Sequence, residues 1–311
     1  MSRDALVFYS AVDDSVAWRE ALAAELPDLD FRVEPDLGDP ADIRYALCWT
    51  PPKGFFARFP NLQLVTNLGA GVDALVRRDD LAPVKFSRLS DPGMVQMMTS
   101  YIVFAVTRYA RDIPVYERAK RRGEWEYVHP RALSDITVAV LGLGELGGPA
   151  ARTLAQMGFT VSGWSRTPKD IPGVTSHTGR EGLEHVLATN EIIVSLVPLT
   201  LETQRLLGAG EFGLMRKGVK FVNASRGAVV DEAALIEALA SGHIGEATLD
   251  VFETEPLPAG HPLWAFENVM ITPHMASITV PKLAARDVAE SIRRVRQGLP
   301  PLHEVDPARG Y

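Results

Sequence analysis

The chain has 311 residues, of which 46% are hydrophobic and 23% charged, and its formal net charge is −7. This length exceeds what one hydrophobic core usually covers, so we expect a globular protein of two domains. The negative charge argues against general affinity for nucleic acid or an anionic membrane, and no run approaches the roughly 18 apolar residues of a membrane span. Cys48 is the single cysteine, which excludes an internal disulfide. We expect a cytoplasmic protein without a metal site.

Strand-like and helix-like segments alternate through the first third of the chain. Residues 15–26 have helical spacing, and from Met94 to about Lys120 the pattern predicts one long helix whose apolar stripe faces the core or a subunit interface. Short apolar runs predict strands at residues 5–9, 31–33, 45–49, 62–66 and 84–86.

The same alternation continues to the end of the chain. Residues 281–297 have the spacing of a helix that packs back on the first domain. Repeated strand–helix units imply parallel sheets with helices on both faces, so the expected fold class is α/β with two doubly wound domains, Rossmann-like and flavodoxin-like. Strands are predicted at residues 137–141, 160–164, 191–196, 220–223, 246–250 and 268–272.

A glycine motif, Gly142-x-Gly144-x-x-Gly147, joins an apolar strand to a helical segment. Gly142 permits a tight turn, Gly144 lets the backbone approach a pyrophosphate, and Gly147 lets the helix pack on the strand with its amides facing the anion. This context predicts a dinucleotide site; the alternative is a plain strand-to-helix turn. We therefore expect a dinucleotide-binding domain at 98–278 and a discontinuous substrate domain formed by 1–97 and 279–311, with the active site in the cleft between them.

The end of the following strand indicates which dinucleotide is bound. NAD-binding domains place an acid there, about 20 residues after the motif, to accept from the ribose 2′-OH. This chain has no carboxylate between Glu145 and Asp170, and its strand ends instead in Ser165-Arg166-Thr167. A guanidinium with neighbouring hydroxyls suits a 2′-phosphate. The sequence predicts a preference for NADP(H), with NAD(H) possible; the alternative is a basic solvated loop.

Three chemically distinct side chains follow three later strands. Arg226, Glu255 and His274 all come after predicted strand ends, where ligands of open α/β sheets bind. An imidazolium can give a proton to a carbonyl oxygen, a carboxylate beside it favours its charged form, and an arginine can hold a substrate carboxylate. This set predicts reduction of a carbonyl group. His261, in a Gly-His-Pro loop, is the alternative histidine.

At this point the chain resembles the D-isomer-specific 2-hydroxyacid dehydrogenases, and within them the glyoxylate/hydroxypyruvate reductase A group. The family's A-x-R-G strand end is matched by residues 224–227, its D-V-F-x-x-E-P by residues 250–256, and its T-P-H by residues 272–274. The resemblance implies that Arg226, Glu255 and His274 are the catalytic residues. Segments similar to the subgroup are residues 49–52, 68–73, 164–167, 255–258 and 308–311.

The resemblance also implies binding residues. Trp49 would wall the substrate pocket, and the turn Gly69-Ala70-Gly71 would present amides to the substrate carboxylate, together with Arg226 and His274. A core aromatic and a simple tight turn are the alternatives. Asp250 would lie near the nicotinamide carboxamide; its alternative is a turn acid. The implied cofactor-binding residues are Gly142, Gly144, Glu145, Leu146, Gly147, Ser165, Arg166, Thr167, Leu196, Pro198, Thr203, Ala224, Ser225 and Asp250.

The activity that the resemblance implies is the NADPH-dependent reduction of small 2-oxo acids. Glyoxylate would give glycolate, and hydroxypyruvate would give D-glycerate. Two alternatives stay open: a dehydrogenase for larger 2-oxo acids such as phenylpyruvate, and a non-catalytic, nucleotide-sensing interaction protein on the same fold. The apolar stripe from Met94 to Lys120 and the segment Arg118–Trp125 resemble the arm through which relatives pair, so a homodimer is expected.

Overall fold

The computed structural model describes residues 4–76, 78–81 and 84–306. The chain divides into two compact units, one formed by Met1–Met94 with Ile278–Tyr311 and the other by Val95–Ser277. The segment 308–311, which resembles the subgroup, lies outside the described residues. Among the described residues, none of the helices combines the length and apolar character that crossing a membrane requires.

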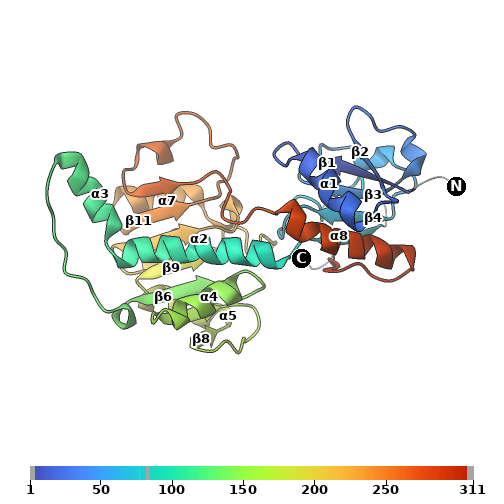
Figure 1. The fold of residues 1–311 in the computed structure, drawn as a ribbon. Coiled ribbons are helices and arrows are strands. Elements are labelled where there is room, and N and C mark those ends of the chain that lie inside the picture. The colour runs from blue at the N-terminus through green and yellow to red at the C-terminus, as the bar shows by residue number, and fades with distance from the viewer. Residues whose placement is uncertain (1–3, 77, 82–83, 307–311) are drawn as a thin grey trace. The chain divides into compact units, whose positions relative to one another are not determined.

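Unit one is built on a five-stranded parallel sheet in the order β2-β1-β3-β4-β5. This is a doubly wound order of the flavodoxin type. Helices α1 (Ser15–Glu25) and α8 (Pro281–Arg296) pack against each other in this unit (Figure 1). The strands are β1 (Ala5–Tyr9), β2 (Asp30–Val33), β3 (Ile43–Cys48), β4 (Leu64–Asn67) and β5 (Lys85–Arg88), and the short 3-10 turns are Pro40–Asp42 and Phe56–Arg58.

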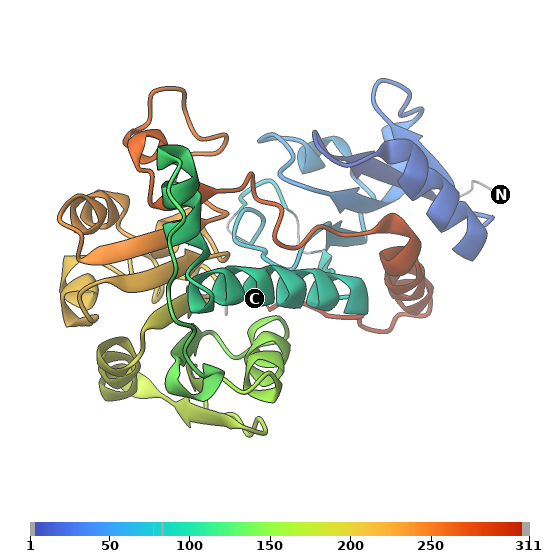
Figure 2. The same ribbon diagram turned by 60° about the vertical axis from the view of Figure 1, so that its left-hand side comes forward.

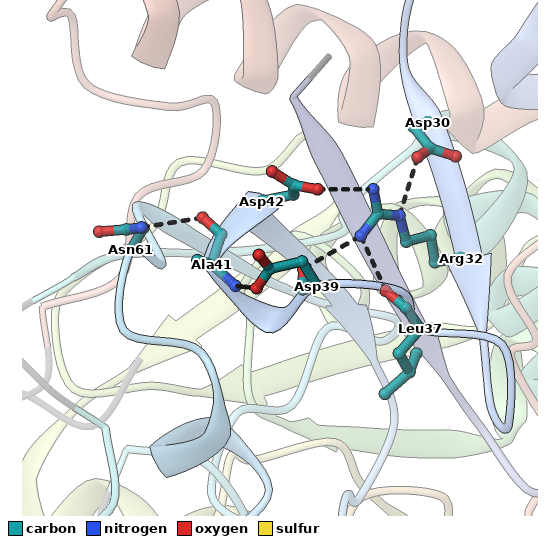
Figure 3. A network of polar contacts seen from close by, with 7 residues as sticks. All are labelled: Asp30, Arg32, Leu37, Asp39, Ala41, Asp42 and Asn61. Atoms are coloured by element: carbon teal, nitrogen blue, oxygen red, sulfur yellow. Dashed lines mark hydrogen bonds and ion pairs between the residues drawn. The ribbon is translucent and has the colours of Figure 1, made fainter. Parts of the chain in front are cut away.

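Arg32 on β2 fixes the connection to β3. Its guanidinium pairs with Asp30 at 2.8 Å and with Asp42 at 3.1 Å, and it donates to the carbonyls of Leu37 at 2.8 Å and Asp39 at 3.1 Å (Figure 3). Only 14% of the Arg32 side chain is exposed. One largely buried cation therefore contacts two carboxylates and two backbone carbonyls around this connection.

Unit two is built on a seven-stranded parallel sheet in the order β12-β11-β10-β9-β6-β7-β8. The chain reverses direction across the sheet between β6 and β9, as in the Rossmann arrangement. The expected class of two doubly wound parallel sheets is thus confirmed. The strands are β6 (Thr137–Leu141), β7 (Thr160–Trp164), β8 (Val174–His177), β9 (Ile192–Ser195), β10 (Val219–Asn223), β11 (Ile244–Leu249) and β12 (Val269–Ile271).

Helices cover both faces of this sheet. Alternate residues of β6 divide between two cores: Val138 and Val140 pack with α2 and α4, whereas Ala139 and Leu141 pack with α5, α6 and α7. Figure 2 shows α2 running along its face of the sheet. The helices are α2 (Pro92–Ala110), α3 (Ile113–Arg122), α4 (Gly147–Gln156), α5 (Gly179–Thr189), α6 (Ala209–Leu214) and α7 (Glu232–Ala240), and the 3-10 turns are Leu133–Asp135, Gly227–Val229 and Pro262–Ala265.

The single long helix expected from Met94 to about Lys120 is wrong. The structure has two helices, α2 and α3, separated at Asp112, whose φ is +52°. Pro114 lies in the first turn of α3 and has no N–H to continue the hydrogen-bond ladder of α2. The apolar stripe of α2 is mostly core, as expected, with Met98, Tyr101 and Tyr109 buried.

Candidate active site

The glycine motif forms the turn from β6 into α4, beside the point where the strand order reverses. Gly142 has a φ of +96°, and a Cβ on it would lie 2.6 Å from the Leu196 carbonyl oxygen. A Cβ on Gly147 would lie 1.8 Å from the Gly142 carbonyl oxygen, so these two glycines are required by the fold. A Cβ on Gly144 would meet nothing within 4 Å. Packing within the chain does not require Gly144, which leaves open space there for a ligand.

The start of α4 suits an anion. Its N-cap residue, Leu146, makes no side-chain capping bond, so no side chain at that position satisfies the first amides of the helix. Glu145 is exposed, while Leu146 is partly buried against the core. The residues present therefore fit a dinucleotide pyrophosphate over this turn.

The loop after β7 carries the residues expected at the 2′-phosphate. Ser165 is buried; its hydroxyl donates to the Thr167 carbonyl at 2.8 Å and its N–H donates to the His177 carbonyl at 3.1 Å. Arg166 and Thr167 are exposed. Ser165 thus shapes the loop, and the cation next to it is accessible to a ligand.

The expected cofactor residues after β9 and β10 lie in tightly bonded turns. After β9, Leu196 is half-buried, and the Thr203 hydroxyl donates to the Pro198 carbonyl at 2.5 Å. After β10, Ala224 and Ser225 are buried, and the Ser225 hydroxyl donates to Asn223 Oδ1 at 2.7 Å. These contacts give the loops fixed shapes at the same edge of the sheet as the glycine turn.

Of the three expected catalytic residues, Glu255 and His274 are in contact. His274 Nδ1 lies 2.7 Å from Glu255 Oε2, and the Phe252 N–H donates to Glu255 Oε1 at 2.9 Å. Burial disfavours the ionised carboxyl, but these hydrogen bonds and the charges of His274 and Arg226 outweigh it, so the pKa of Glu255 is lowered. Arg226 is half-buried, and its Nη1 donates to the Ser225 carbonyl at 2.8 Å.

The backbone around His274 is held by Asp250. His274 has a φ of +53°, which is uncommon for a residue with a side chain. Its N–H donates to the Asp250 carbonyl at 2.8 Å, while the buried Asp250 carboxylate accepts from the N–H groups of Met275 and Ala276, each at 2.9 Å. These contacts hold the turn that carries His274, and the position of Asp250 near the nicotinamide carboxamide stays a prediction.

Tyr101 and Thr272 complete this network; Thr272 belongs to the T-P-H segment, whereas sequence patterns gave no signal for a role of Tyr101 in the site. The Thr272 hydroxyl donates to Asp250 Oδ1 at 2.6 Å and lies 2.6 Å from the Tyr101 hydroxyl. Burial, with a contribution from the Asp250 charge, raises the pKa of Tyr101 to about 12. Tyr101 is therefore a protonated donor to Thr272 at neutral pH.

The alternative histidine, His261, has a structural role in its loop. His261 caps the 3-10 turn Pro262–Ala265 by accepting from the Leu263 N–H, and its Nε2 lies 3.0 Å from Glu232 Oε1. Both of its ring nitrogens are thereby occupied within a loop.

In unit one, the structure brings Trp49 and Gly69 together. A Cβ on Gly69 would lie 2.7 Å from Cζ3 of Trp49, so the indole occupies the space of a side chain. Gly69, Ala70 and Gly71 are partly exposed, and Trp49 is half-buried. The contact explains why a glycine is needed at position 69 and places both expected substrate residues side by side.

Unit two is a doubly wound sheet with a glycine turn where the strand order reverses, and it carries a histidine–carboxylate pair after later strands. This arrangement is typical of a dinucleotide-dependent oxidoreductase. Residues 103–276 match the model of the D-isomer specific 2-hydroxyacid dehydrogenase NAD-binding domain. The chain belongs to the D-isomer specific 2-hydroxyacid dehydrogenase family.

Individual relatives cover the whole chain. It is 36% identical to a glyoxylate/hydroxypyruvate reductase A of Yersinia enterocolitica, over 98% of this chain and 99% of the relative. A D-isomer specific 2-hydroxyacid dehydrogenase from Xanthobacter autotrophicus Py2, solved with NADPH and MES, is 58% identical with a TM-score of 0.95, covering 99% of this chain and 100% of that one. The chain is also similar to an NADPH-dependent glyoxylate/hydroxypyruvate reductase from Sinorhizobium meliloti, solved with NADP and sulfate. The identity is 32% and the TM-score 0.93, covering 99% of this chain and 100% of that one.

Proposed function

We propose that this protein reduces small 2-oxo acids with NADPH, converting glyoxylate to glycolate and hydroxypyruvate to D-glycerate. The observation that carries the proposal is the 2.7 Å contact between His274 Nδ1 and Glu255 Oε2. It supplies an oriented proton donor in a chain whose relatives include glyoxylate/hydroxypyruvate reductases. The coenzyme preference is supported by the exposed Arg166 and by the NADPH and NADP bound to the solved relatives.

The proposed roles follow from the chemistry of each side chain. NADPH, when bound, supplies the hydride that adds to C2 of the acid. Glu255 accepts from Nδ1 of His274, which leaves Nε2 to donate a proton to the developing alkoxide. Arg226 holds the substrate carboxylate and stabilises the charge that develops on the oxygen. Changing His274 to Ala should therefore lower kcat by about 100-fold or more, with the NADPH dissociation constant nearly unchanged.

We further propose that unit two binds the dinucleotide and that unit one contributes Trp49 and the amides of residues 69–71 to substrate binding. The boundaries expected for these domains, 1–97 with 279–311 and 98–278, stay a prediction. So do the contacts of the cofactor-binding residues with NADPH, a homodimeric state and a cytoplasmic location.

A panel of 2-oxo acids assayed with NADPH and with NADH tests this function. We expect turnover of glyoxylate and hydroxypyruvate, with a lower KM for NADPH than for NADH. Faster turnover of phenylpyruvate would favour a dehydrogenase for larger acids. NADPH binding without turnover of any acid would favour a non-catalytic sensor, and equal KM values for the two coenzymes would contradict the role of Arg166.

A further inference from the structure

We infer that Asn67 is a positioning residue for substrate binding, because its side chain turns the amides of Ala70, Gly71 and Val72 into an anion-binding cradle. This inference rests on the proposed function, in which residues 69–71 bind a carboxylate. The new point is the reason why these residues can bind an anion. That reason is the buried side chain of Asn67, which lies outside the turn.

The geometry begins at the carboxyl ends of two neighbouring strands. Asn67 ends β4, Arg88 ends β5, and the two residues are paired in the parallel register. Asn67 is 2% exposed, and its Nδ2 donates to the carbonyls of Gly69 at 2.9 Å and Gly71 at 2.8 Å. Arg88 Nη1 donates to the carbonyl between them, that of Ala70, at 3.2 Å. Three successive carbonyls are therefore engaged by donors at the end of the sheet.

The amides that follow these carbonyls must face the other way. In a trans peptide the C=O and the next N–H point in opposite directions, and the described cis bonds are Glu34–Pro35 and Glu255–Pro256. Among the residues that the structure describes, no hydrogen bond is donated by the N–H of Ala70, Gly71 or Val72. Three successive amides directed away from the sheet are the donor set of a backbone anion site.

The chemistry of this position requires an amide. Both partners of Nδ2 are carbonyl oxygens, so the contact needs two N–H donors on one atom, which Asn supplies. An aspartate has the same shape but would direct a carboxylate oxygen at two carbonyl oxygens. Asn67→Asp should therefore release the turn and add a negative charge behind it.

The test compares Asn67→Asp with Asn61→Asp in the full-length protein. Asn61 is also in unit one and also donates Nδ2 to a backbone carbonyl, that of Ala41 at 2.8 Å (Figure 3). It is exposed and precedes β4, whereas the turn follows that strand. We expect Asn67→Asp to raise the KM for glyoxylate by about tenfold or more, with the NADPH dissociation constant unchanged and a smaller change in kcat. Asn61→Asp should leave all three unchanged.

A second readout separates this inference from the proposed reaction. In the 15N-labelled wild type, oxalate should shift the amide resonances of Ala70, Gly71 and Val72, and Asn67→Asp should abolish these shifts. Such shifts in a protein that reduces no 2-oxo acid would leave the inference standing and contradict the proposed function. The inference would be overturned if the wild type reduced 2-oxo acids but Asn67→Asp had an unchanged KM for glyoxylate. It would also be overturned if the wild type turned over but oxalate shifted none of these amide resonances. Asn67→Asp could fail to fold, and Arg88→Met then tests the same turn, because it removes the donor to the Ala70 carbonyl. Arg88→Met must raise the KM by about threefold for the inference to hold.

Discussion

At the residue scale, Glu255 has two consequences that can be measured separately. Because its pKa is lower in the folded protein than its ordinary value of 4.5, ionised Glu255 stabilises the fold above that pH, and this contribution is lost as the pH falls through the folded pKa. Glu255→Gln should therefore be less stable than the wild type at neutral pH, and the difference should shrink below pH 4.5. Chemical denaturation of both proteins at several pH values measures this.

The same variant should also lower kcat, since an amide cannot hold a protonated imidazole as a carboxylate does. We expect a decrease of about 100-fold. A variant with wild-type kcat would show that Glu255 supports the fold alone.

The glycine turn permits a comparison of two chemically identical changes. Gly144→Ala should fold normally, because its Cβ meets nothing within 4 Å, yet it should raise the KM for NADPH by occupying space needed for the pyrophosphate. Gly147→Ala should be strongly destabilised, because its Cβ would lie 1.8 Å from a carbonyl oxygen. Thermal unfolding and NADPH titration distinguish the two. An unchanged KM in Gly144→Ala would argue against a dinucleotide at this turn.

Candidate site residues could be predicted from the sequence where the residue type is unusual for its place in a strand–helix unit. Glycines after an apolar strand, and Arg, Glu and His after strand ends, have few structural reasons to be there. Asn67 and Tyr101 could not be found this way, because their roles depend on hydrogen bonds to groups that the fold brings close. The contacts of Asp250 likewise depend on the turn that follows β12.

At the scale of elements, the Thr272 hydroxyl links helix α2 to the loop that carries His274. Thr272→Val removes its bonds to Asp250 and Tyr101, leaves the Tyr101 hydroxyl without its partner, and should cost about 1–3 kcal/mol of stability. It should also lower kcat, because the Asp250 carboxylate loses one of the contacts that orient it.

Thr248→Val is the matched control for this change. Tyr109, also on α2, makes a 2.6 Å contact with Thr248 on β11 that does not involve Asp250. The control should lose similar stability but keep the wild-type kcat. Equal effects of the two variants on kcat would refute a positioning role for Thr272.

The loop between β2 and β3 depends on Arg32 in the same way. Arg32→Met retains apolar volume but removes the guanidinium that contacts Asp30, Asp42 and two backbone carbonyls (Figure 3). We expect a loss of about 1–3 kcal/mol in the free energy of unfolding. Denaturation with urea measures it, and Arg58→Met, at a 47% exposed ion pair, is the control expected to change little.

Strands and helices were predictable where burial gives a clear apolar pattern, as in β1, β6 and β9. Strand β8 was not predicted, because Val174–His177 is a polar segment at the edge of the sheet. The break between α2 and α3 was missed because the apolar pattern continues through Ile113, although Pro114 offered a signal.

At the scale of the whole molecule, we expect the segment after α3 to take part in a dimer interface. Trp125 is 99% exposed and Tyr127 is 74% exposed, and the segment runs along the outside of unit two (Figure 1). Large exposed aromatic side chains are typical of interface anchors. We expect sedimentation to give twice the mass of one chain, and Trp125→Glu to weaken the dimer about tenfold or more. A monomeric wild type would contradict this.

The discontinuity of unit one bears on how the chain matures during synthesis. Its five strands leave the ribosome first, but α8, which packs on α1 and whose Arg293 donates to the Glu25 carbonyl at 2.7 Å, emerges only after all of unit two. Helix α1 must therefore wait for its partner helix while the intervening residues are translated. The later-encoded unit can reach its native state first, which makes the nascent N-terminal region the part of this polypeptide most in need of chaperone protection.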